Sequence, residues 1–121
     1  MCFSAEADIV TGAVVAVAGA DALRHVQHPR ELPLAALPGL LAAHQFTEAF
    51  VWSDLEAVAP PVGTGMAVTL YALVAFVVLP AYFPWAVRAV EPLPERRRRM
   101  LPFAVLGLLV ALVYAVDMSG R

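Results

Sequence analysis

Charge and cysteine are scarce in this sequence. Charged residues make up 15% of the chain, and a single cysteine excludes a disulfide within it. The formal net charge of −2 argues against a nucleic-acid partner. The sequence contains no glycine-rich phosphate loop, no GxGxxG motif and no serine nucleophile elbow. Because no base or oxyanion donor can be assigned to Cys2 either, we expect no enzymatic activity.

Apolar residues, in contrast, are in excess. They make up 61% of the sequence, with a mean hydropathy of +0.76, whereas soluble domains average about 45–50%. A chain of 121 residues has too little interior to bury so much apolar surface. We therefore predict a multi-pass integral membrane protein. Glu6 and Asp8 stand where a signal peptide would be basic, so the first apolar segment is not expected to be a cleaved leader.

Four apolar segments have the length of membrane-spanning helices. Ser4 is a suitable N-cap for the first, and Pro33 suits the first turn of the second. Pro80 and Pro84 interrupt the end of the third, and residues 91–99 are predicted to form a connecting loop. The sequence thus predicts an all-α bundle, a single domain over residues 1–121, with spans at about 5–24, 32–52, 66–87 and 100–116.

Small residues mark one face of the first predicted helix. Gly12, Ala16 and Ala20 are spaced by four, with Gly19 beside them. Such a face lets a second helix approach closely. Ordinary alanine-rich composition explains the same pattern equally well.

The arginines predict an orientation. Seven of the eight basic residues lie in the connections after the first and third helices, and only Arg121 lies elsewhere. By the positive-inside rule these connections are cytoplasmic, so both termini and the second connection are extracytoplasmic. Five of the ten acidic residues lie on that second side: Glu6, Asp8, Asp54, Glu56 and Asp117.

Four consecutive arginines precede the fourth predicted helix. Arg96, Arg97, Arg98 and Arg99 are suited to binding anionic lipid headgroups. The alternative is a topology anchor with no specific ligand.

A polar stripe interrupts the second predicted helix. At helical spacing His44, Glu48 and Trp52 lie one above another, and Gln45 precedes Glu48 by three residues. Inside a bilayer such groups are costly unless they face a partner, a cavity or a bound species. We therefore predict that these four residues form an inward-facing polar or ligand site near the outer surface.

Two functions need no metal at this stripe. In the first, its groups hydrogen-bond to neighbouring helices and to Trp52 or Tyr71. The protein is then a small membrane scaffold or accessory subunit, a homo-oligomer or part of a larger complex. In the second, Glu48 beside His44 relays a proton or passes a small solute.

A third function is metal binding. Antiparallel packing would bring Cys2 and Glu6, at the start of the first helix, toward His44 and Glu48. Thiolate, imidazole and carboxylate suit copper or zinc, and the predicted ligands are Cys2, His44 and Glu48. Haem is a weaker candidate, because one histidine on a helix does not identify it.

Two sequence features carry a resemblance to a known family. The chain opens Met1-Cys2-Phe3-Ser4-Ala5, and residues 44–52 follow the pattern [H/Q]-Q-x-x-E-x-x-x-W. Both features resemble a family of bacterial multi-pass membrane proteins of unknown function, whose longer members have more helices. The resemblance implies a bacterial inner-membrane location and singles out Cys2, Gln45, Glu48 and Trp52. It also implies that glutamine can replace His44, and it brings no activity with it.

Overall fold

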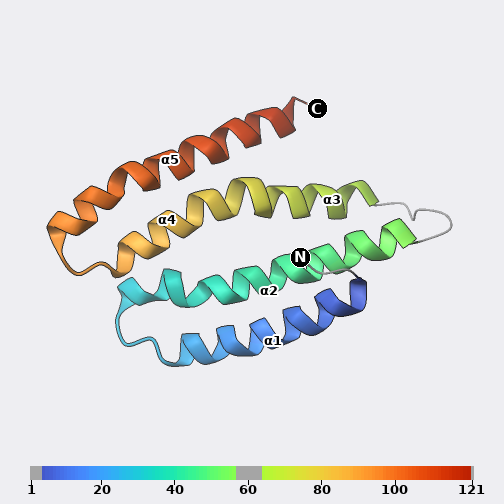
Figure 1. Ribbon diagram of the computed structural model, residues 1–121, viewed down its shortest axis with the longest axis horizontal. Helices are drawn as coiled ribbons and strands as arrows, with labels where there is room; N and C mark the ends of the chain where they lie inside the picture. The colour runs from blue at the N-terminus through green and yellow to red at the C-terminus, as the bar shows by residue number, and fades with distance from the viewer. Residues whose placement is uncertain (1–3, 57–63, 121) are drawn as a thin grey trace.

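The computed structural model describes residues 4–56 and 64–120 of the chain. Apart from short connections this part is helical, with no strand, which confirms the all-α prediction. Four rods run antiparallel in chain order (Figure 1): α1 (Ala5–Arg24), α2 (Leu32–Glu56), the α3–α4 rod and α5 (Pro94–Ser119). The α3–α4 rod consists of α3 (Thr64–Leu73), the π-helical turn η2 (Val74–Val78) and α4 (Leu79–Val90).

The rods form an open row instead of a closed bundle. Helix α1 packs on α2, α2 packs on the α3–α4 rod, and α5 packs on the other side of that rod. Helices α1 and α5 therefore lie at opposite edges of the row (Figure 1). The connections after α1 and after α4, with the arginines that flank them, lie together at one end, whereas the start of α1 and the end of α5 lie toward the other.

Helix α1 begins and ends through local hydrogen bonds. The Ser4 hydroxyl accepts the Ala7 N–H at 3.2 Å, as expected of an N-cap. After α1, the Glu31 carboxylate in the short helix η1 (Pro29–Glu31) accepts the N–H groups of Gln27, at 2.9 Å, and His28, at 3.3 Å. These two donors favour the charged form and hold the pKa of Glu31 below its usual value. The Glu31 carboxylate thus closes the turn into α2.

Glycines set the distance between α1 and α2. A Cβ on Gly19 would lie 2.9 Å from the backbone nitrogen of Gly39, and one on Gly12 would lie 3.0 Å from the Phe46 ring. Because real Cβ atoms do not approach backbone so closely, α1 and α2 can pack this tightly only with glycine at position 19.

Proline accounts for the π turn in the α3–α4 rod. The Pro80 ring would clash with the carbonyl of Phe76 in a regular α-helix, and Pro80 supplies no N–H. The wider turn over Val74–Val78 lies immediately before this position and accommodates it. The rod then continues through Pro84 to Val90, three residues beyond the predicted end of the third span at residue 87.

Helix α5 begins earlier than predicted. The expected loop over residues 91–99 is wrong: only 91–93 connect the helices, and the arginines form the first turns of α5. Pro94 at the first helical position is preorganised for a helix start, and Glu95 adds an acid to the first turn. Arginine is itself a good helix former, so the run extends α5.

Two of the described helical segments are long and apolar enough to cross a membrane. They are Gly65–Val90 and Pro94–Ser119, each of 26 residues. Helices α1 and α2, of 20 and 25 residues, are not among them; α1 carries Glu6, Asp8, Asp21 and Arg24, and α2 carries His44, Gln45 and Glu48. Large apolar side chains are exposed on all four rods; Val17, for example, is 71% exposed and Phe103 is 68% exposed. Exposed apolar surface of this kind is typical of proteins that contact a membrane or other proteins.

Candidate functional site

A polar cluster is formed by α2 and by the two helices that pack against it, α1 and α3. It consists of Asp8 from α1, His44 and Glu48 from α2, and Tyr71 from α3. The His44 and Tyr71 rings stack with their centroids 4.5 Å apart and their planes at 24°. Asp8 and Glu48 are both close enough to act electrostatically on His44 and on Tyr71. The cluster thus gathers four ionisable side chains from three helices.

Two members of the polar cluster are buried without hydrogen-bond partners. Asp8 is fully buried, and neither of its carboxylate oxygens is bonded to any group in the described chain. His44 is 9% exposed, and its Nδ1 atom is likewise unbonded there. Leaving such groups unpaired away from water costs free energy. The polar cluster therefore has unused hydrogen-bonding capacity at the Asp8 carboxylate and at the His44 Nδ1 atom.

The helical repeat of α1 directs Asp8 to α2. Asp8 lies on the buried face of α1 with Ala5, Gly12 and Gly19, which are spaced so that they share one side of a helix. Glu6, on another side, is exposed. The acid that reaches the polar stripe is therefore Asp8 and not Glu6, which corrects the expectation from sequence.

The small-residue face of α1 also differs from the prediction. Ala16 is half-buried and Ala20 is exposed, whereas Gly12 and Gly19 are buried. The face that meets α2 thus combines two glycines with a buried acid. The signal in the sequence was that Asp8 precedes Gly12 by four residues.

The residues of the predicted stripe have different environments. His44 is buried, whereas Gln45, Glu48 and Trp52 are half-buried. His44 meets Tyr71 through ring stacking, not through the hydrogen bond that a purely structural stripe would use. The imidazole is thus the member of the stripe that is most enclosed by protein.

The predicted metal set is only partly within the described structure. Cys2 lies outside the described residues, so a site made of Cys2, His44 and Glu48 stays a prediction. Within residues 4–56 and 64–120, no three His, Cys, Asp or Glu side chains are grouped closely enough to hold a metal ion.

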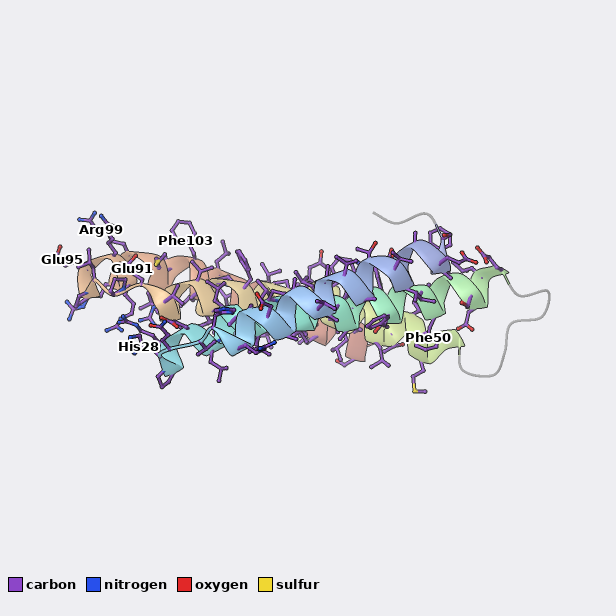
Figure 2. The ribbon with its side chains drawn as sticks, turned by 90° about the horizontal axis from the view of Figure 1, so that it is seen from below. His28, Phe50, Glu91, Glu95, Arg99 and Phe103 are labelled. Atoms are coloured by element: carbon purple, nitrogen blue, oxygen red, sulfur yellow. The ribbon has the colours of Figure 1, made fainter. Side chains whose placement is uncertain are left out.

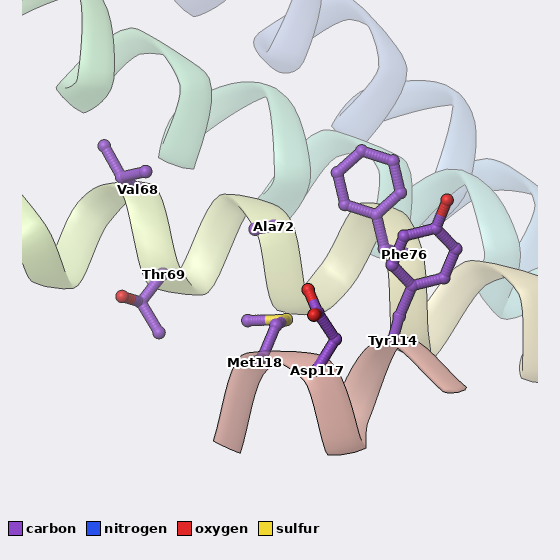
Figure 3. A pocket seen from close by; sticks show the side chains of 7 residues that line it. All are labelled: Val68, Thr69, Ala72, Phe76, Tyr114, Asp117 and Met118. Atoms are coloured by element: carbon purple, nitrogen blue, oxygen red, sulfur yellow. The ribbon is translucent and has the colours of Figure 1, made fainter. Parts of the chain in front are cut away.

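A separate groove lies between the α3–α4 rod and α5, toward the end of the row where α1 begins and α5 ends (Figures 1 and 3). It has a volume of about 390 Å³ and is lined by Val68, Thr69, Ala72, Phe76, Tyr114, Asp117 and Met118. The rings of Phe76 and Tyr114 stack at its inner end, with centroids 5.0 Å apart. This groove was not predicted from the sequence, although Tyr114 and Asp117 are spaced to share one face of α5.

The four arginines extend from the first turns of α5 and are exposed. Arg88, near the end of α4, fixes this region: its Nε atom donates to the Arg97 carbonyl at 3.1 Å. Its guanidinium lies over the Trp85 ring, 5.3 Å from the centroid, in a cation–π contact. Arg88 thus links the end of α4 to the first turns of α5, which carry the four arginines.

These features define an all-α protein with two candidate membrane-spanning helices and a buried polar cluster. The chain belongs to a family of unknown function (DUF6629), which matches residues 1–121. This agrees with the resemblance to an uncharacterised family. No curated protein and no solved structure matches the chain.

Proposed function

We propose that this chain is a small membrane scaffold or accessory subunit of the bacterial inner membrane. It crosses the bilayer four times, with both termini extracytoplasmic, and associates with copies of itself or with other membrane subunits. The polar cluster fixes the order of α1, α2 and α3 within the row. The observation that carries this proposal is the open row, with helix edges that no other part of the described chain covers.

The distribution of charge supports the four-span orientation. The connections after α1 and after α4, which the arginines flank, lie at one end of the row (Figure 1). Asp54 and Glu56, at the end of α2, and Asp117, near the end of α5, lie toward the other. In a membrane this asymmetry favours the arginine end on the cytoplasmic side.

The edges of the row support association. On α1 the outward valines Val10, Val14 and Val17 are each more than 60% exposed. On α5 the exposed side chains include Leu112 and Val113, at 60% and 66%. Surfaces of this kind are buried by lipid or by further membrane helices.

Cysteine labelling tests the orientation. In a Cys2→Ser background, we expect Glu56→Cys to react with a membrane-impermeant maleimide in intact cells. Arg30→Cys is expected to react only after the membrane is permeabilised, because its connection is cytoplasmic.

Native mass spectrometry in mild detergent tests the association, and it is expected to show more than one chain or a bound partner. Labelling of Arg30→Cys in intact cells would contradict the orientation, and a lone monomer would contradict the scaffold.

Proton or small-solute passage is a second candidate function. The observation that favours it is the buried, unbonded Nδ1 atom of His44 in a cluster that also contains Asp8 and Glu48. Ionisable groups inside membrane helices commonly mark such paths.

Flux through liposomes tests this second function. We expect the wild-type chain to dissipate a pH gradient and Glu48→Gln to reduce the flux to that of protein-free liposomes. Glu6→Gln, at an exposed acid of α1, is the matched control and is expected to retain the flux. Equal flux in the wild type and Glu48→Gln would exclude a relay through this carboxylate.

A further inference from the structure

An apolar groove runs between α4 and α5 near the arginine end of the row. It is lined by Phe83, Pro84 and Val87 of α4 and by Met100 and Phe103 of α5. Almost no polar surface faces it. Its walls come from the two helical segments that are apolar enough to cross a membrane.

Arginines lie directly beyond this groove along α5. Arg96 and Arg99 line a second hollow at the start of the helix, together with Leu93, Pro94 and Glu95. Because Arg96, Arg99 and Phe103 are spaced by three and four residues, they share one face of α5. Figure 2 shows Arg99 and Phe103 on the same side of the helix, with Arg99 nearer its start.

Among the described residues, the two guanidiniums have no acidic partner. Neither Arg96 nor Arg99 forms an ion pair within the described chain. Of the nearby acids, Glu91 accepts the Leu93 N–H at 3.0 Å, and Glu95 lines the hollow without pairing to either arginine. A phosphate group fits this pair of cations, because arginine binds phosphate oxygens through two parallel N–H groups.

We propose that this surface binds one anionic phospholipid, with its phosphate at Arg96 and Arg99 and an acyl chain in the groove between α4 and α5. The arginines favour an anionic headgroup, and the apolar side chains of the groove contact the acyl chain. A free phosphate would use the arginines alone, and a partner helix would use the groove alone. The proposal rests on the membrane placement in the proposed function and not on the scaffold role.

Native mass spectrometry of the full-length chain in neutral detergent tests the proposal. Phosphatidylglycerol and phosphatidylcholine with identical acyl chains are the two probes. We expect phosphatidylglycerol to bind more tightly, and glycerol 3-phosphate to leave it bound. Displacement by glycerol 3-phosphate would overturn the role of the groove.

Two double variants distinguish binding at this site from general electrostatic attraction of the lipid. We expect R96Q/R99Q to weaken phosphatidylglycerol binding roughly 30-fold, because two basic groups near the headgroup are lost. R24Q/R30Q removes the same charge at the same end of the row and is expected to change binding about twofold or less. Equal losses in both double variants would show that only net charge matters, and would overturn the site.

A third variant tests the acyl-chain contact. Phe103→Ala is expected to weaken the binding of both lipids by about tenfold, since it removes a large apolar side chain that lines the groove. The circular dichroism spectrum is expected to remain that of a helical protein. Unchanged binding would overturn the groove. The native mass spectra also report the number of chains in the assembly. Loss of lipid binding by the wild-type chain with the assembly retained would therefore refute this site without refuting the scaffold.

Discussion

Replacing Gly107 with alanine is expected to push α5 away from the α3–α4 rod and lower the free energy of unfolding by about 1–3 kcal/mol. Gly107 is buried against α4. An added Cβ would collide with the Pro80 carbonyl oxygen and lie 3.1 Å from the Pro84 ring. A backbone carbonyl and a proline ring cannot rotate away, so the helices themselves must separate.

The sequence explains why α5 comes so close at this point. In a regular helix the Pro80 carbonyl would accept the N–H of residue 84, but residue 84 is proline and has none. The carbonyl is therefore free to face Gly107, where a Cα–H group offers a weak donor. Two prolines and one glycine thus set the packing of α5 on α4.

Denaturant titration of the full-length chain in detergent measures the effect. Gly39→Ala is the matched control, because nothing lies within 4 Å of a Cβ at Gly39. In mid-helix, alanine is expected to leave stability unchanged or raise it by up to about 1 kcal/mol. If Gly107→Ala unfolds at the same denaturant concentration as the wild type, the close contact does not exist in solution.

The helices were largely predictable from the sequence because long apolar runs with clear ends determine them. The first span ends at Arg24 both in the prediction and in the structure. The start of α5 was missed because a run of like charges suggested a solvated loop, whereas Pro94 and Glu95 form a helix start. Local residue chemistry outweighed the charge pattern there.

The polar cluster was only half predictable. His44 and Glu48 stand out within an apolar run, but Asp8 had a local explanation as an acid in the first turn of a helix. Its burial depends on the register of α1 against α2, which Gly12 and Gly19 set. The groove beyond Arg96 and Arg99 similarly requires the pairing of α4 with α5. Such features arise from contacts between helices and have no signature within a single segment.

Asp8→Ala is expected to stabilise the fold. Removing a buried, unbonded carboxylate relieves a cost of about 1–3 kcal/mol, whereas losing an acid from the first turn of α1 costs about 0.3–1 kcal/mol. The net expectation is a free energy of unfolding that is higher by up to about 2.7 kcal/mol. Alanine also fits the face of α1 that already contains Ala5, Gly12 and Gly19.

The same denaturant titration measures this change in stability. Glu6→Ala is the control, because Glu6 is an exposed acid two residues before Asp8. We expect Glu6→Ala to change stability by no more than about 0.5 kcal/mol. Lower stability in Asp8→Ala would mean that the carboxylate is paired in the folded protein, contrary to its unbonded state in the described chain. A gain in stability would instead mean that the chain retains a costly buried acid. A residue kept at such a cost is expected to serve binding or proton transfer, because packing alone would favour the alanine.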